Sequence, residues 1–182
     1  MGDGAKKGGA AALAAAIVDG SSDRTLASYI DDLEGDNKNA AVTAARVVDE
    51  LVALQANLGA PFIARLVALL TSPQPRVVQT AQHCLPELAR VAPAKVAKQM
   101  DKIRAAYDDA GDDGRDGVVR TFVALCVASV AYQRRVIDLL ERALGDAEPK
   151  TLVAWSDVVL PALKGEPHAT ARAVVEGRLP TL

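Results

Sequence analysis

Apolar side chains recur at helical spacing along most of the chain, and no stretch alternates strictly between apolar and polar positions. Residues 94–108 show this clearly, because apolar side chains fall at i, i+4, i+7 and i+11 while lysines occupy the opposite face. The apolar positions are Val96, Met100, Ile103 and Tyr107, and the lysines are Lys95, Lys98 and Lys102. The other apolar residues are mainly Ala, Val and Leu, which gives strands little support. The pattern therefore predicts an all-α protein.

The helical pattern repeats with a period near 37 residues. Leucines near the ends of apolar segments are separated by 37, 37 and 38 residues: Leu51, Leu88, Leu125 and Leu163. Short polar or proline breaks between apolar segments are separated by 37, 36 and 37 residues: Asp36, Pro73, Asp109 and Asp146. Two independent markers in phase indicate that the chain consists of consecutive copies of one unit.

Each unit is expected to be a helix, a short loop and a second helix. The first helices are predicted at 23–34, 61–71, 94–108 and 132–144, the second helices at 38–56, 75–91, 115–130 and 148–163, and a last helix at 168–178. Pro61 and Pro93 suit the first turns of helices. Aspartates are expected to cap the second helices with their side-chain oxygens: Asp36, Asp112, Asp113 and Asp116.

Over about residues 22–178 the chain resembles the HEAT-repeat family of α-solenoids. The resemblance rests on the period, the paired helices, the aspartate in the loop and a basic residue early in each second helix: Lys38, Arg76, Arg115 and Lys150. Pro73 departs from the pattern, because it replaces the loop aspartate. The resemblance implies a right-handed superhelix of about four helix pairs plus a terminal helix. It also implies that the second helices line a concave face, which usually binds another macromolecule.

The domain organisation predicted from the sequence is simple. Residues 1–20 form an Ala/Gly-rich tail, with a short helix after about residue 8 that could cap the repeats, and residues 21–182 form the repeat domain. Lys6 and Lys7 before an apolar stretch imitate a signal peptide, but the stretch is mostly alanine and runs into Asp19. No run of about 20 continuous apolar residues is present. We therefore expect a cytoplasmic protein without a membrane partner, in which Cys84 and Cys126 are reduced core thiols.

Composition argues against nucleic acid and against catalysis. The 21 basic residues do not exceed the 23 acidic ones, and the chain has only one Trp and two Phe for stacking on bases. Motifs for phosphate, dinucleotide and metal binding are missing, so we predict no cofactor and no enzymatic activity. The acidic stretch 108–117 fails as an EF-hand, because Gly114 and Val123 stand at two ligand positions. A solvated loop that caps the next helix is favoured there over a weak cation site.

A candidate binding surface emerges from polar residues in phase with the repeat. Arg46, His83 and Arg120 are separated by 37 and 37 residues, and Trp155 follows after 35. On the same helix faces lie Glu50, beside Arg46, and Gln79, beside His83. These six residues, named here the ladder, would face a partner if the second helices line the concave side. The alternative is that they are ordinary solvated surface and that Trp155 fills the core.

The function expected from the sequence is a non-enzymatic scaffold or adaptor that holds another protein or a peptide on the concave face. Arg46 and Arg120 would offer charge-assisted hydrogen bonds to acidic or carbonyl groups. Two alternatives stay open: a nucleic-acid-binding or DNA-repair protein of the HEAT-like kind, and a structural subunit whose ends carry the contacts. The oligomeric state does not follow from the sequence.

Overall fold

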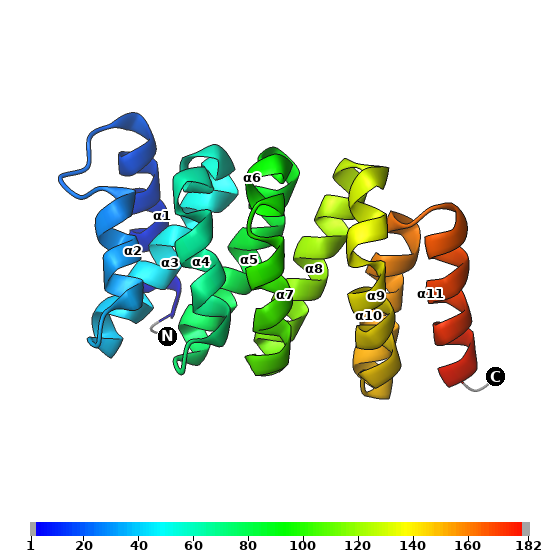
Figure 1. Cartoon of the computed structure of the whole chain (residues 1–182). Coiled ribbons are helices and arrows are strands. Elements are labelled where there is room, and N and C mark those ends of the chain that lie inside the picture. Colours follow the sequence, from blue (N-terminus) through cyan, green and yellow to red (C-terminus); the bar gives the residue numbers. More distant parts are fainter. Residues whose placement is uncertain (1–2, 180–182) are drawn as a thin grey trace.

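The computed structural model describes residues 3–179, and every regular element among them is helical (Figure 1). The prediction of an all-α protein is confirmed. The α-helices are α1 (Asp3–Asp19), α2 (Leu26–Glu34), α3 (Lys38–Gln55), α4 (Ile63–Ala68), α5 (Pro75–Val91), α6 (Pro93–Ala97), α7 (Met100–Asp109), α8 (Asp112–Ala128), α9 (Val130–Asp146), α10 (Pro149–Ala162) and α11 (Gly165–Arg178). Two 3₁₀ segments, η1 (Ala56–Phe62) and η2 (Leu69–Thr71), flank α4.

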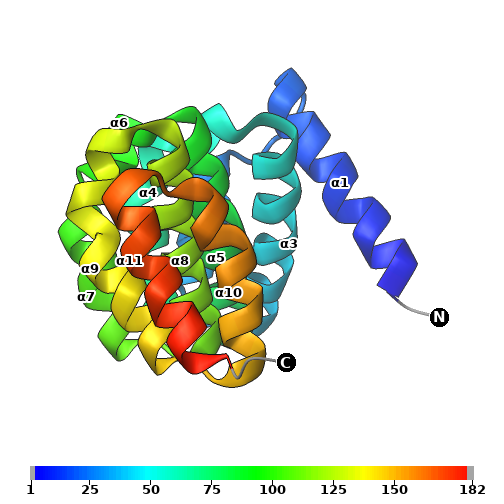
Figure 2. The ribbon, with the colours of Figure 1, turned by 90° about the vertical axis from the view of Figure 1, so that its right-hand side faces the viewer.

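The helices form two layers (Figures 1 and 2). The first layer contains α2, α4, α7, α9 and α11. The second layer contains α3, α5, α8 and α10, in which α3 packs against α5, α5 against α8, and α8 against α10. Helix α1 packs against α3 and lies beyond it, on the side away from the first layer (Figure 2).

Most helix bounds lie within about three residues of those predicted, but two first-layer helices are interrupted. The segment predicted as 61–71 is a 3₁₀–α–3₁₀ succession, because Pro61 lacks the N–H that an α-helix would use. The segment predicted as 94–108 divides into α6 and α7, where the N–H of Gln99 bonds to the carbonyl of Val96 at 2.8 Å in a tighter turn. At the other end of the chain, α1 begins at Asp3, earlier than the short helix expected after residue 8.

The core runs between the two layers. The apolar face predicted for residues 94–108 is buried there, with Val96 and Ile103 fully enclosed and Met100 and Tyr107 nearly so. Cys84 and Cys126 are also buried and unpaired, as predicted. Burial raises the pKa of the Cys84 thiol well above its ordinary value and that of Cys126 to about 12. Neither thiol is a thiolate near neutral pH, so neither is a ready nucleophile.

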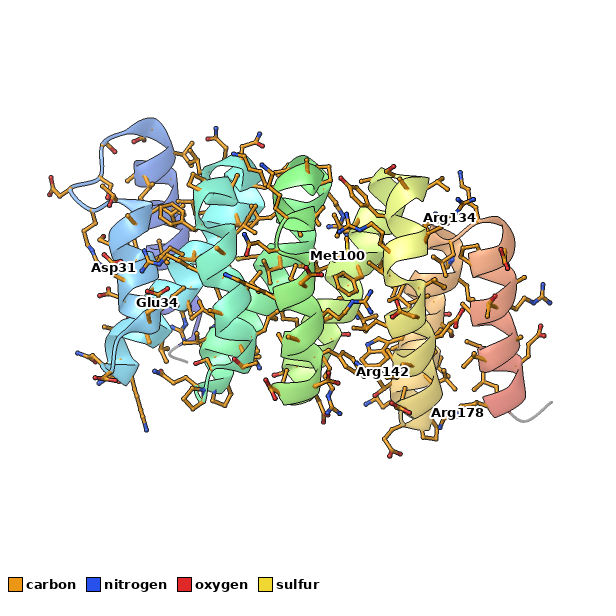
Figure 3. The ribbon with its side chains drawn as sticks, in the orientation of Figure 1. Asp31, Glu34, Met100, Arg134, Arg142 and Arg178 are labelled. Carbon is orange, nitrogen blue, oxygen red and sulfur yellow. The ribbon has the colours of Figure 1, made fainter. Side chains whose placement is uncertain are left out.

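Ion pairs join consecutive helices of the first layer. Asp31 and Glu34 on α2 bind the guanidinium of Arg65 on α4, with Asp31 Oδ1 2.7 Å from Arg65 Nη2. Arg142 on α9 binds Asp108 on α7 at 3.0 Å, and Arg178 on α11 donates to the carbonyl of Leu144 on α9 at 3.2 Å. Figure 3 labels Asp31, Glu34, Arg142 and Arg178 along this layer. The side-by-side order of the first layer is therefore held by polar as well as apolar contacts.

One segment is long and apolar enough, by composition alone, to cross a membrane. It covers Lys38–Thr71 and contains a window with a mean hydropathy of 1.5. The sequence analysis looked for about 20 continuous apolar residues and found none. This segment qualifies by a different criterion, the mean hydropathy of a window that contains some polar residues. In the fold the segment includes α3, η1, α4 and η2, so its chain passes from the second layer into the first.

Candidate partner-binding groove

The second layer carries an open hollow of about 650 Å³, named here the groove. Its lining comes from consecutive second-layer helices, with Val52 on α3, Pro86 on α5, Val123 on α8 and Val158 on α10 supplying apolar surface. On α8 the lining residues Asp116, Arg120 and Val123 follow the spacing i, i+4, i+7, which places them on one face of the helix. On α5 the residues His83, Glu87 and Arg90 do the same. The helical period thus places the polar side chains of α5 and α8 beside the apolar residues that line the groove.

Asp116 is the centre of a hydrogen-bond cluster on one side of the groove. Its Oδ2 accepts from Arg120 Nε at 2.7 Å and from the side-chain amide of Gln82 on α5. Its Oδ1 accepts from Trp155 Nε1 on α10 at 2.8 Å. One carboxylate therefore joins α5, α8 and α10, and it fixes the guanidinium of Arg120 from beneath. The expected cap at Asp116 is wrong, because α8 begins earlier, at Asp112, and places this side chain one turn inside the helix.

Asp49 holds the other side of the groove. Its carboxylate binds the guanidinium of Arg76 and lies 3.9 Å from Nδ1 of His83. Burial raises the pKa of Asp49, and this effect exceeds the opposing pull of Arg76 and His83. The carboxylate is inside the molecule, whereas the imidazole of His83 is 59% exposed above it. Asp49 thus fixes the guanidinium of Arg76 close to His83 and has little surface of its own.

The structure brings only part of the ladder together. His83 and Arg120 both line the groove. Arg46 and Glu50 are half-buried on α3 and lie outside its lining, and Gln79 bonds to Asp113 of α8 at 3.3 Å, also outside it. Trp155 is only 4% exposed, because its ring packs in the core while its Nε1 reaches Asp116. Of the two interpretations of Trp155, the burial of its ring agrees with the one in which the tryptophan fills the core.

Sequence reasoning missed both carboxylates at the base of the groove. The ladder was built from steps of 37 residues, whereas the hydrogen bonds between neighbouring second-layer helices join residues at other separations: Asp49 and Arg76 are 27 residues apart, and Asp116 and Trp155 are 39 apart. Gln82 and Asp116 are 34 residues apart, as are Gln79 and Asp113, and Thr80 bonds to the carbonyl of Ala45 over a separation of 35. The second-layer helices therefore do not meet at residues a whole period apart. A search for complementary polar residues 34–35 apart would have found Asp116.

Other chemistry is limited within the described part of the chain. No group of three or more His, Cys, Asp and Glu side chains among residues 9–179 is placed to hold a metal ion. The stretch 108–117, expected to be a solvated acidic loop, contains the end of α7, a short connection and the first turns of α8, where Gly114 and Gly117 are buried. Arg90 lies close in sequence to the lysines at 95, 98 and 102. In the structure it lines the groove and pairs with Glu87.

Comparison of the chain with protein-family models, with curated proteins and with solved structures finds no match.

Proposed function

We propose that this protein is a HEAT-like α-solenoid that binds a segment of another protein in the groove. Three observations support the architecture. The sequence period is near 37 residues, the helices alternate between two layers, and several hydrogen bonds between neighbouring helices of one layer join residues 34 apart. Such a stack presents the second helices side by side, so that one partner segment can contact several units at once.

The observation that carries the binding proposal is that two exposed side chains with hydrogen-bond donors, His83 and Arg120, lie beside the apolar residues that line the groove. The side chain of His83 is 59% exposed and lies 3.9 Å from a carboxylate oxygen of Asp49, and that of Arg120 is 42% exposed and is hydrogen-bonded to Asp116. Because the guanidinium of Arg120 is already positioned, a partner that binds it loses less conformational entropy than one that must order a free side chain. Such donors bind acceptor groups, and the acceptors that a protein partner can offer are backbone carbonyls and acidic side chains.

The same contacts favour a binding role over a catalytic one. The carboxylates of the groove are engaged with Arg76, Arg120 and Trp155, and the nearby thiol of Cys84 is buried in its protonated form. We therefore propose a non-enzymatic scaffold or adaptor without a cofactor, which works in the reducing environment of the cytoplasm.

The test is a selection of peptides on the intact protein, followed by titration of the selected peptide against wild type and Arg120→Glu. We expect Arg120→Glu to weaken binding by about tenfold or more, because the new carboxylate repels the ligand groups that Arg120 attracts. Arg120→Gln, which avoids a second negative charge beside Asp116, should weaken binding by a smaller factor. Circular dichroism would establish that both variants keep their helical content.

Lys102→Glu is the matched control, because it makes the same charge change at an exposed residue of α7 in the first layer. It should leave the affinity unchanged. Equal affinities for wild type and Arg120→Glu would refute the groove proposal. Selective retention of nucleic acid, with an affinity that falls steeply with salt, would favour the nucleic-acid alternative instead.

A further inference from the structure

From α3 to α11 the connections between helices lie along two opposite edges of the stack (Figure 1). One edge, named here the junction edge, holds the connections from each second-layer helix to the next first-layer helix. It comprises the connections and adjoining helix ends at 54–62, 90–98, 127–135 and 163–166. The opposite edge holds the connections at 35–37, 72–74, 110–111 and 147–148. Because the helices run between the two edges, residues near a helix end lie on one edge or the other.

Charge is divided between these edges. The junction edge has one acidic residue, Glu166, and six basic ones: Arg90, Lys95, Lys98, Arg134, Arg135 and Lys164. Acidic residues gather at the opposite edge: Asp31, Asp32, Glu34, Asp36, Asp108, Asp109, Asp112, Asp113, Asp146 and Glu148. Figure 3 shows Arg134 toward the junction edge, whereas Arg142, farther along the same helix, lies toward the opposite edge. The net charge of -2 therefore conceals a basic edge and an acidic edge.

Most cations of the junction edge are not engaged by the fold. In the part of the chain that the structure describes, Arg134 and Arg135 are the two arginines whose guanidinium groups have no hydrogen bond, ion pair or ring contact. Both are exposed, as are Lys95, Lys98 and Lys164. Because an exposed cation without a partner adds little to the stability of a fold, these charges are free to bind an anionic surface.

Exposed apolar side chains recur on the same edge. Leu54, Val91 and Val127 stand at the ends of α3, α5 and α8, at separations of 37 and 36 residues, and Val130 begins α9. The four residues are between 45% and 70% exposed. They do not belong to the groove, whose apolar lining comes from other residues. The junction edge thus carries a row of aliphatic side chains among unpaired cations.

We propose that the junction edge binds the surface of a bilayer that contains anionic lipids. The lysines and arginines contact the anionic groups of the lipids, and the exposed Leu and Val side chains enter the boundary between headgroups and acyl chains. No helix crosses the membrane in this arrangement. The acidic edge is repelled by the lipids and points away from them. Since the helices run between the two edges, they stand upright on the membrane, and the groove stays open at the side.

A membrane surface fits these observations better than nucleic acid or an acidic protein. Nucleic acid would use the cations but not the aliphatic side chains, and the aromatic residues of the edge, Phe62 and Tyr132, pack against the core. A protein partner is expected to bind apolar residues that are gathered in one pocket, whereas these are spread over three units. The expectation of no membrane partner came from the search for a spanning segment, which does not detect a surface contact of this kind.

Co-sedimentation of the intact protein with lipid vesicles tests the proposal. The wild type should bind vesicles of phosphatidylcholine and phosphatidylserine in a molar ratio of about 7 to 3, and it should not bind phosphatidylcholine alone. Arg134→Glu/Arg135→Glu should lower the partition coefficient by about tenfold or more, because two cations at the contact become anions. Lys38→Glu/Lys150→Glu is the matched control, since it makes the same change in net charge at the opposite edge and should leave binding near the wild-type level.

Two further variants test the apolar part of the contact without changing the charge. Val127→Trp should strengthen vesicle binding, because tryptophan favours the interface between membrane and water. Val91→Asn/Val127→Asn should weaken it by about threefold or more, because less apolar surface leaves water. Circular dichroism without vesicles would establish that every variant keeps its helical content.

Three results would overturn the proposal: a wild type that does not bind the phosphatidylserine vesicles, equal losses in the two charge-reversal variants, and apolar variants that bind like wild type. The last result, together with a loss in Arg134→Glu/Arg135→Glu, would favour nucleic acid or an acidic protein as the partner of this edge. None of these results depends on the groove, since Arg120 is not on the junction edge. Peptide titration of Arg120→Glu therefore tests the groove separately.

Discussion

At the scale of single residues, the carboxylates of Asp49 and Asp116 influence which polar side chains face the groove. Asp116 binds Gln82, Arg120 and Trp155, and Asp49 binds Arg76 close to His83. A buried carboxylate is costly unless its oxygens are bonded, and these donors offset that cost. Arg120 and Trp155, which the sequence repeat singled out, are therefore both hydrogen-bonded to Asp116, which it did not.

Replacing Asp116 by Asn tests this arrangement. The amide keeps the size of the side chain but removes the charge and turns one acceptor into a donor that faces the donors of Arg120 and Trp155. We expect the free energy of unfolding to fall by about 1–3 kcal/mol, because these bonds are charge-assisted and the Asp116 side chain is only 18% exposed. Urea denaturation measures the change.

Asp157→Asn is the control, since Asp157 is exposed on α10 and should change stability by less than about 0.5 kcal/mol. Equal losses in the two variants would mean that the cluster at Asp116 contributes nothing specific.

At the scale of elements, α8 approaches η2 and α5 closely because two of its glycines face them. A Cβ atom at Gly114 would lie 2.5 Å from the carbonyl oxygen of Leu70, and one at Gly117 would lie 2.9 Å from Cα of Gln82. Both contacts are shorter than a carbon side chain tolerates against backbone. Gly117 therefore sets the distance between α5 and α8, and with it the geometry that lets Gln82 reach Asp116, whereas Gly114 lets α8 approach η2.

Gly117→Ala should destabilise the protein by about 1–3 kcal/mol, because the methyl group forces α5 and α8 apart. The loss is expected even though alanine favours an isolated helix over glycine by about 1 kcal/mol. Gly177→Ala on α11 provides the opposite case, since no atom lies within 4 Å of its added Cβ, and it should be neutral or stabilising. Thermal unfolding of both variants measures the difference, and a stabilising Gly117→Ala would contradict the close approach.

At the scale of the whole molecule, the junction between α7 and α9 is the most polar part of the first layer. Arg104 binds Asp138 across it, Arg142 binds Asp108, and the ring of Tyr107 lies between the guanidinium groups of Arg115 and Arg142 at 5.4 and 5.2 Å. The hydrogen bond from Arg104 lowers the pKa of Asp138 below its ordinary value of 3.8. A carboxyl with a lowered pKa stabilises the folded state above pH 3.8, and this contribution disappears as the pH falls through the lowered pKa.

Arg104→Gln should therefore be less stable than wild type at neutral pH, and the difference should shrink as the pH falls below 3.8. Denaturation at a series of pH values measures it, and an NMR titration should show the pKa of Asp138 returning toward its ordinary value in the variant. Lys102→Gln on the same helix should show no such pH dependence. A stability difference that is constant from neutral to acidic pH would mean that the ion pair with Asp138 is not its cause.

The sequence by itself determined the helices, their alternation and much of their burial. Local periodicity is enough for this, because a helix is recognised from apolar positions 3–4 residues apart and is interrupted by proline and glycine within the same segment. The bounds of α5 were predicted to the residue, and the buried face from Val96 to Tyr107 was predicted correctly. The period of 37 residues also indicated which helices are equivalent.

Only the tertiary structure decided how equivalent helices meet. Side-chain packing between helices that are distant in sequence sets which residues meet, so that Asp116 bonds to Gln82 across 34 residues and to Trp155 across 39. The same packing removed Trp155 from the surface, left Arg46 and Glu50 outside the groove and placed Asp49 beneath His83. A repeat identifies residues that occupy equivalent places, whereas the contacts between those places depend on the distance and offset of the helices in space.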